Sequence, residues 1–303
     1  MATAGNIRQA DVANGIPVII ANATLEYFKN NTVLARLVRR DYENEVAQAG
    51  DTVTITKLTG LTVQDKSANT DYALDQLATS KVDVVLNKHK YVSFLIEDVA
   101  KFLAKPDYQQ ALIDEGVAKI AEKIDADLMA LRADITTNVV GSAGVDATAD
   151  ILVDARKKLT ISKAPMANRY IAFSAKDAGA LLKLEKFTSS NWNAENGAAL
   201  VEANLGRRYG FDLFECQGVE TSGSSPVSTW NIAFNKNAFA LVTRPLGLPG
   251  DGSGVKAYYA NADGIGLRVM MSYQHAKGGW MVTIDVLYGV KTVREELACK
   301  ILT

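Results

Sequence analysis

The sequence is poor in the residues that build covalently linked or metal-bound folds. Its 303 residues include only two cysteines, Cys216 and Cys299, and two histidines, His89 and His275. Two cysteines far apart in sequence exclude a disulfide scaffold and a cysteine-rich metal site, and two histidines exclude a multi-histidine site. We expect both cysteines to be buried apolar side chains and both histidines to be structural, in a reducing cytosol.

An excess of charge of one sign is also missing. Lys and Arg number 33 against 34 Asp and Glu, a formal net charge of −1, which excludes a strongly basic nucleic-acid binder but leaves a local basic patch open. No apolar run is long enough for a transmembrane helix, and the N-terminus lacks the pattern of a signal peptide. The length fits one large or two ordinary domains.

Catalytic motifs are absent as well. Gly250–Gly254 is rich in glycine but lacks the Lys and Ser/Thr of a phosphate-binding loop, and Asp251 breaks the pattern of a serine nucleophile. Asp125 and Asp127 are two residues apart on an expected helix, so they point to different faces, and we interpret them as a solvated face. The sequence therefore predicts no enzyme: no catalytic residue, no cofactor-binding residue and no metal site.

The sequence does contain long segments with the patterns of strands and of a helix. Residues 51–57 alternate apolar and polar side chains, which predicts a strand. Apolar residues of one parity recur from Val82 to Ile96 and predict a single strand, roughly 50 Å long at ~3.3 Å per residue. The polar segment 59–80 joins the two strands. A ribbon this long is hard to bury within its own subunit, so we predict a projecting arm that packs on a neighbour.

The clearest helix covers residues 107–135, where apolar residues recur every fourth position from Tyr108 to Leu128. It would be roughly 43 Å long at ~1.5 Å per residue. Ahead of the ribbon, residues 16–38 predict two short amphipathic helices, the second ending near Arg39 and Arg40.

Beyond Gly141–Gly144 the pattern becomes α/β. It predicts helices over 149–160 and 175–184, a further helix that ends at 206–208, and strands over 170–173, 211–215, 231–234 and 238–242. Residues 267–273 and 280–288 alternate as strands, Gly289 breaks the pattern, and 291–302 form a last mixed run. We expect these last strands to return to the sheet beside the long helix, so that 145–262 is an insertion.

Several local stretches carry a resemblance to a known family. They are Lys81–Asp98, Asn204–Cys216, Leu267–Met271 and Trp280–Gly289. In this order they resemble segments of the major capsid proteins of tailed double-stranded DNA bacteriophages, which have the Hong Kong 97-type fold. The sequence is similar in particular to coat proteins of short-tailed phages that use a separate scaffolding protein.

The resemblance implies an α+β fold in four parts. These are an N-terminal arm (1–45), an extended two-stranded loop (46–97), a peripheral domain with a long spine helix (98–144 plus 263–303) and an inserted axial α/β domain (145–262).

The resemblance also implies a function and partners. The protein would assemble with itself, through hexamers and pentamers, into the icosahedral shell that encloses a phage double-stranded DNA genome, without sequence-specific DNA binding and without a membrane. A separate scaffolding protein and a portal would be its partners, since a fused scaffold has no room ahead of the arm and Met1 argues against processing. The protein would be located in the virion after assembly in the host cytoplasm.

Other functions stay open. An encapsulin-like cellular shell shares the fold and holds protein cargo. An α/β ligand-binding protein or enzyme would be built on 145–262, with the loop 247–254 as its best feature. Another phage structural protein, such as a tail-tube or decoration subunit, fits the length and the long helix less well.

Ten residues are candidates for subunit interfaces. Val53, Ile55, Val84 and Phe94 would form the packing face of the ribbon on a neighbour. Arg36, Arg39 and Arg40 would pair with a neighbour's carboxylates, or form a solvated helix face. Lys88 and Lys90 are interpreted as edge charges that prevent aggregation, or as part of a nucleic-acid strip with His89 and Tyr91. Trp192 would be an interface anchor, or a locally packed aromatic side chain.

Overall fold

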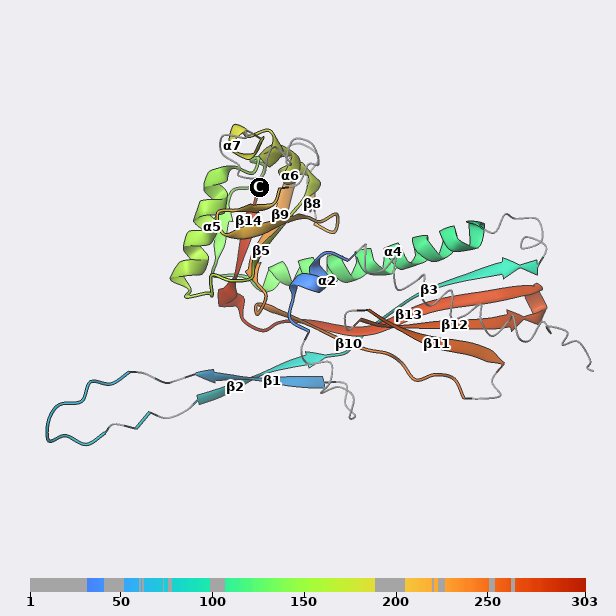
Figure 1. The fold of residues 1–303 in the computed structure, drawn as a ribbon, viewed down its shortest axis with the longest axis horizontal. Helices are drawn as coiled ribbons and strands as arrows, with labels where there is room; N and C mark the ends of the chain where they lie inside the picture. Colours follow the sequence, from blue (N-terminus) through green and yellow to red (C-terminus); the bar gives the residue numbers. More distant parts are fainter. Residues whose placement is uncertain are drawn as a thin grey trace, which may run out of the picture.

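A computed structural model describes residues 32–40, 52–59, 61, 63–72, 74–75, 78–98, 107–188, 205–219, 221–222, 227–250, 254–262 and 265–303. In this part of the chain two sheets are joined along one long helix, and a two-stranded ribbon projects from one end (Figure 1). The arrangement is mixed α and β, as the sequence predicts.

The long helix is α4, Asp107–Ala130, followed by a 3₁₀ turn over Leu131–Asp134. This confirms the helix predicted over 107–135. Buried apolar side chains recur along it at helical spacing, among them Ile113, Val117, Ile120, Ile124 and Leu128. Figure 1 shows α4 lying along the five-stranded sheet. Gly116 allows β3 to approach, because an added Cβ would lie 3.2 Å from Val92 Cγ1.

The five-stranded sheet is antiparallel throughout. Its strands are β3 (Lys88–Glu97), β10 (Phe239–Arg244), β11 (Val255–Ala262), β12 (Ile265–Gln274) and β13 (Gly279–Thr292). β13 pairs with β3, β12 and β10 in turn. The strands predicted over 267–273 and 280–288 are confirmed. The predicted break at Gly289 is wrong, because Gly289 pairs with Val242 and β13 continues to Thr292.

The seven-stranded sheet lies at the other end of α4. Its strands are β4 (Val139–Gly141), β5 (Arg169–Phe173), β6 (Arg207–Arg208), β7 (Phe211–Glu215), β8 (Thr221–Ser222), β9 (Ser228–Asn235) and β14 (Ala298–Leu302). Helices α5 (Ala149–Ile161), α6 (Ala175–Leu182) and the short α7 (Glu185–Thr188) accompany it. The predicted helices 149–160 and 175–184, and the strands 170–173 and 211–215, are confirmed.

Two predictions in this region are wrong. The last strand, β14, does not return to the sheet beside the long helix, because it pairs with β9 and β4 in the seven-stranded sheet. Residues 207–208 do not end a helix, because they form β6 and pair with β7. The helix expected to lead into them follows the polar loop predicted over 188–197, and its residues up to 204 lie outside the described residues, as does the first of the two helices expected in 16–38.

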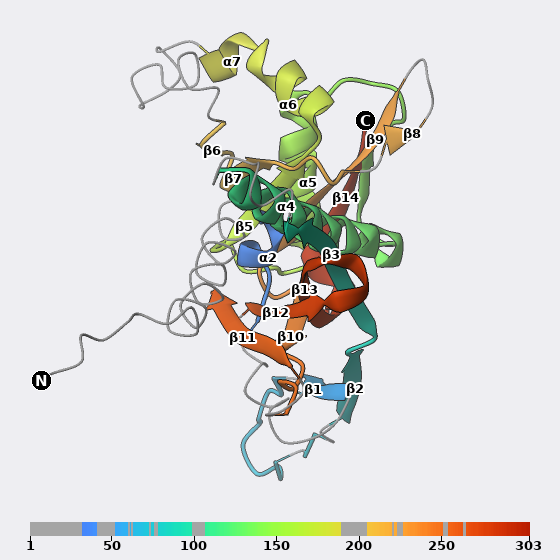
Figure 2. The same ribbon diagram turned by 90° about the vertical axis from the view of Figure 1, so that its right-hand side faces the viewer.

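The ribbon consists of β1 (Thr52–Thr59) and β2 (Ala78–Val85), paired in antiparallel register. The single strand predicted over 82–96 is wrong. β2 ends at Val85, the Asn87 amide donates to the Val85 carbonyl over 3.1 Å, and β3 begins at Lys88 with a new partner, β13. The ribbon is therefore a separate sheet that leaves the body of the protein (Figures 1 and 2).

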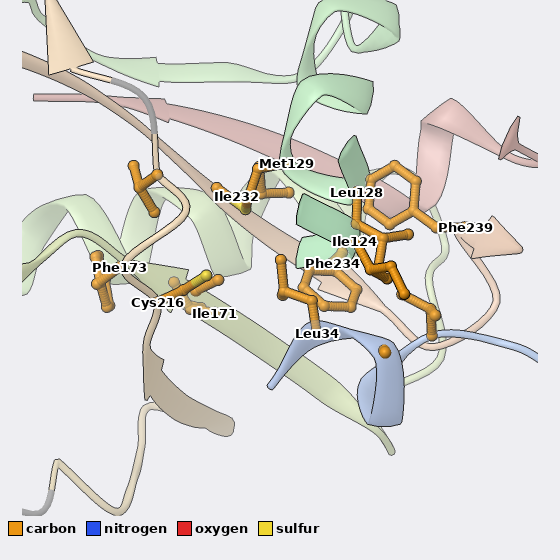
Figure 3. Packing of buried hydrophobic residues seen from close by; sticks show 14 of the residues in the cluster. Leu34, Ile124, Leu128, Met129, Ile171, Phe173, Cys216, Ile232, Phe234 and Phe239 are labelled. Atoms are coloured by element: carbon orange, nitrogen blue, oxygen red, sulfur yellow. The ribbon is translucent and has the colours of Figure 1, made fainter. Parts of the chain in front are cut away.

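The hydrophobic core joins both sheets to α4 and to the short helix α2 (Leu34–Leu37). Figure 3 shows Leu34, Ile124, Leu128, Phe234 and Phe239 gathered in one cluster. A smaller second cluster lies at the base of the ribbon. One continuous core fixes the two sheets relative to each other, and the ribbon rests on a core of its own.

Candidate assembly surfaces

The tip of the ribbon, residues 61–75, is the most exposed apolar segment that the structure describes. Leu61, Val63, Tyr72 and Leu74 have exposed fractions between 76% and 101%. Soluble monomers rarely expose several large apolar side chains together unless they mark an interaction site. The tip also has three acids, Asp65, Asp71 and Asp75, against Lys66, a net charge of −2.

Local contacts give the tip a defined conformation. The Lys66 Nζ lies 4.6 Å from the centre of the Tyr72 ring, a cation–π arrangement. Thr70 Oγ1 donates to the Ser67 carbonyl over 2.9 Å, and Asn69 takes a left-handed backbone conformation with φ 63°. The tip thus presents its apolar side chains from an ordered turn. The polar residues of 59–80 predict an excursion and do not reveal these apolar side chains, although the spacing of Leu61 and Val63 is a signal of them.

The base of the ribbon is buried within the same chain. Val53, Ile55 and Val84 pack with Leu86 and, from β10, with Ala240 and Val242. Val84 is fully buried and Ile55 is only 7% exposed. The prediction that these side chains would be poorly covered in a monomer and would pack on a neighbour is wrong, because β10 of their own subunit covers them.

Two further contacts hold the ribbon to the body. Lys57 Nζ lies 2.6 Å from Glu296 Oε1, so an ion pair ties β1 to the turn before β14. Gly289 in β13 faces the backbone of β2, where an added Cβ would lie 2.3 Å from the Val85 carbonyl oxygen. Only glycine permits this approach, so the position of the ribbon depends on a residue far away in sequence.

Lys88 takes part in a partly buried network rather than in an exposed edge. Its Nζ lies 2.9 Å from Asp127 Oδ2, which also accepts a hydrogen bond from the Tyr288 hydroxyl over 2.8 Å. Lys123 lies 3.1 Å from Asp127 Oδ1. Burial opposes ionisation, but these three donors hold the pKa of Asp127 below its ordinary value. Burial, together with the hydrogen bond to Asp127, raises the pKa of Tyr288.

The carboxylate pair of the sequence analysis is therefore not a solvated face. Asp125 and Asp127 are 4% and 7% exposed. They point to different sides of α4, as predicted, but each faces a different packed neighbour: Asp127 faces β3 and β13 of the five-stranded sheet, and Asp125 faces α2. Both positions were misinterpreted because helical spacing does not reveal what packs against each face.

The remaining candidates divide between the body and the surface. Phe94 is in β3, not in the ribbon, and packs on the main core, and Lys90 on the same strand is partly buried. Arg36 is exposed. Arg39 forms a backbone bridge with β10, and Arg40 has a buried guanidinium nitrogen, Nη1, without a hydrogen-bond partner among the described residues. Trp192 lies outside the described residues.

Reactive groups form no evident chemical site in the described part of the chain. No group of three or more His, Cys, Asp and Glu is placed to bind a metal there. His89 contacts Asp285, with Nε2 3.2 Å from Oδ2, and Arg268 binds the same buried carboxylate. Both cysteines are buried, as expected, and burial raises the pKa of Cys216 to about 11. Among the described helices, none is long and apolar enough to cross a membrane.

Comparisons of the sequence with family models and with curated proteins found no match. The fold, by contrast, is similar to solved structures. A chain from Mycobacterium phage Che8 is 23% identical, with a TM-score of 0.67 over 89% of this chain and 90% of that one. A chain from the capsid of cyanophage P-SCSP1u is 14% identical, with a TM-score of 0.60 over 89% and 87%.

A chain from the virus-like particle of Pyrococcus furiosus is similar at greater distance, with 10% identity and a TM-score of 0.52 over 93% of this chain and 97% of that one. The similarity to the two phage chains covers 89% of this chain. The chain therefore has the fold that phage capsid proteins share.

Proposed function

We propose that this protein is the major capsid protein of a tailed bacteriophage, with the Hong Kong 97-type fold, and that it assembles with itself into an icosahedral shell around a double-stranded DNA genome. The observation that carries the proposal is the fold similarity over about nine-tenths of the chain to a phage capsid chain. The exposed apolar tip of the ribbon, which is out of reach of the chain's own core, supports it.

In this proposal the ribbon tip makes the main contact between neighbouring subunits. Its apolar side chains would be buried on a second copy of the chain, and α4 with the two sheets would act as a rigid body. Fully burying one large apolar side chain contributes about 1.5–3 kcal/mol, so the four would contribute roughly 6–12 kcal/mol before the costs of association. Such contacts are weak singly and sum to a stable shell.

The two sheets suggest how the chain divides into domains. We propose a peripheral domain built on α4 and the five-stranded sheet, and an axial domain built on the seven-stranded sheet. The strands of the first sheet come from three predicted ranges: β3 from 46–97, β10 and β11 from 145–262, and β12 and β13 from 263–303. The axial domain would meet its symmetry mates in hexamers and pentamers, as the family resemblance implies.

The proposed partners follow from the same assembly. A shell of this kind would use a separate scaffolding protein and a portal, would not require a catalytic site, and would be part of the virion after assembly in the host cytoplasm. The net charge of −1 suits a shell that encloses DNA without binding its phosphates tightly.

The direct test of the proposal substitutes the exposed apolar side chains of the ribbon tip and measures assembly. Changing Leu61, Val63, Tyr72 and Leu74 together to Ser should leave a folded monomer, because these side chains touch little of their own chain. We expect shells from the wild type and none from this variant, by electron microscopy and sedimentation. A matched control with Leu61→Ile, Val63→Ile, Tyr72→Phe and Leu74→Ile keeps the tip apolar and should still assemble. Normal closed shells from the Ser variant would contradict the proposed contact.

The second candidate is an encapsulin-like shell, favoured by the similarity to the Pyrococcus furiosus virus-like particle. The content of purified particles separates the two functions. Encapsidated double-stranded DNA, protected from nuclease, supports the phage capsid. A copurifying protein cargo without nucleic acid supports the cellular shell.

A further inference from the structure

The hairpin of β6 and β7 lies at one edge of the seven-stranded sheet (Figure 2). Arg208 pairs with Phe211, so only Tyr209 and Gly210 form the turn between the strands. Their φ angles, 51° and 84°, are both positive, as in the tight two-residue turns that join paired strands. Positive φ is unusual for an aromatic residue. The packing of Tyr209 against the main core and the full burial of Phe211 hold the hairpin in this conformation.

Arginine side chains gather at this hairpin from three elements. Arg207 and Arg208 form β6, and a Cβ added to Gly210 in the turn would lie 3.9 Å from Cζ of Arg156 on α5. Arg169, at the start of β5, lies near Arg156, since burial and then the charge of Arg156 lower the pKa of Arg169. Positive groups are therefore neighbours of one another at this place in the fold.

Few carboxylates balance these arginines. Arg169 is only 3% exposed, and its guanidinium donates to two backbone carbonyls and a threonine hydroxyl rather than to an acid. Arg208 donates to the Arg207 carbonyl over 2.9 Å, and its Nε is buried without a hydrogen-bond partner in the described part of the chain. No ion pair joins Arg156 to a described carboxylate. Asp212 alone approaches, with Oδ1 3.6 Å from Arg207 Nε in an exposed pair.

The acid that precedes Arg156 on α5 faces elsewhere. Asp154 lines a hollow beside β4, together with Lys157 and Lys158. The hairpin side of α5 thus keeps a local excess of positive charge, although the whole chain has a net charge of −1. Crowded or buried charges of one sign are stabilised by a group of opposite sign, so this surface fits an anion.

We propose that Arg156, Arg207 and Arg208, called here the arginine patch, bind the phosphate backbone of a nucleic acid without reading its bases. Guanidinium groups match phosphate oxygens in bidentate pairs, and a helix and a strand hold these three in place. In the described part of the chain, none of the exposed large apolar side chains lies on the hairpin. A protein partner would need apolar contacts at the centre of its interface, whereas phosphate contacts need charge and carry no sequence information.

The choice of double-stranded DNA as the ligand rests on the proposed function, whereas binding to a phosphate backbone does not. In a shell, the arginine patch would make a weak, salt-sensitive contact with the enclosed DNA. A few such contacts per subunit are compatible with a chain of net charge −1, because they are local and bind far less tightly than a strongly basic surface.

Fluorescence anisotropy with a labelled DNA duplex of about 20 base pairs tests the arginine patch on the unassembled full chain, with light scattering of the same samples to verify that it is monomeric. Three phosphate contacts predict a slope of about −2.7 for the logarithm of the association constant against that of the salt concentration. The affinity should thus fall roughly 40-fold between 50 and 200 mM salt. Changing the three arginines together to Gln should weaken binding at least about tenfold at 50 mM salt and remove most of the slope.

Two control variants separate this site from a general effect of charge. Lys at the same three positions keeps the charge and should retain most of the salt dependence. Lys81→Gln, Lys277→Gln and Lys291→Gln together remove three exposed positive charges from the ribbon and the five-stranded sheet. This variant should bind the duplex within about twofold of the wild type, because its substitutions lie outside the arginine patch.

Should the partly buried Arg208 prove necessary for folding, Arg156→Gln with Arg207→Gln changes only exposed side chains and should reduce the slope by about 1.8. Absence of duplex binding by the wild type at 50 mM salt, or equal losses in the arginine and lysine variants, would overturn the proposal. Binding of a peptide of residues 61–75 in place of the duplex would also overturn it and assign the arginine patch to a second copy. The assay needs no shell, so its failure is distinct from a failure to assemble.

Discussion

Asp127 shows, at the scale of single residues, how three elements are joined. The carboxylate on α4 accepts hydrogen bonds from Lys88 at the start of β3 and from Tyr288 in β13. Because Asp127 and Tyr288 are both buried, loss of one donor would leave a charged acceptor less satisfied in a medium of low polarity. The sequence shows an Asp, a Lys and a Tyr but does not reveal that they bind one another, since the three residues are distant along the chain.

Tyr288→Phe removes one donor and leaves the ring in place. We expect the free energy of unfolding at pH 7 to fall by about 2 kcal/mol, since hydrogen bonds to charged groups are worth more than neutral ones. Tyr273→Phe is the control, because its hydroxyl also donates to a carboxylate, Asp98, over 2.7 Å, but in an exposed setting. We expect little change in the free energy of unfolding there, because water replaces the lost partner. Equal losses in urea denaturation would refute the role given to burial.

Gly289→Ala tests the closest backbone approach in the ribbon attachment. The new Cβ would meet the Val85 carbonyl oxygen at 2.3 Å, so β2 or β13 must shift. We expect a loss of stability of about 1–3 kcal/mol, the usual range for overpacking. Gly250→Ala has open space around it and should be nearly neutral in the same thermal and urea unfolding experiments. A neutral Gly289→Ala would mean that the ribbon does not rest on β13 as described.

At the scale of elements, the ribbon separates into a base that stabilises the chain and a tip that is free to bind. The alternation of apolar residues predicted β1, and the helical spacing predicted α4, because each pattern reflects one buried face. The break at Leu86 and Asn87 was not predictable in this way. The parity of apolar residues continues across it, and the change of partner from β1 to β13 depends on a contact with Gly289.

Two valine substitutions should separate the roles of base and tip. Val84→Ala removes a fully buried side chain and should lower the free energy of unfolding by about 1–3 kcal/mol. Val63→Ser changes a fully exposed side chain and should leave the stability within about 0.5 kcal/mol, while it weakens assembly. Calorimetry measures the first effect and light scattering of assembly the second. A destabilised Val63→Ser would show that the tip already packs on its own subunit.

At the scale of the whole molecule, the chain crosses between its two sheets several times. β10 to β13 lie in the five-stranded sheet, and β14 then pairs within the seven-stranded sheet. The two sheets are therefore connected by these chain crossings as well as by α4. The order of strand types along the sequence favoured an insertion, but the sheet that each strand joins is set by long-range pairing. The family resemblance predicted the overall fold, which the periodicity of apolar residues alone does not predict. The interface residues it suggested include several that the chain buries for itself.

The most direct measurement of the central claim is a cryo-electron microscopy reconstruction of the protein assembled in solution. The account predicts a closed icosahedral shell in which each ribbon tip, with Leu61, Val63, Tyr72 and Leu74, is buried on a neighbouring copy. A persistent monomer under all conditions, or a shell whose ribbon tips remain in solvent, would contradict it.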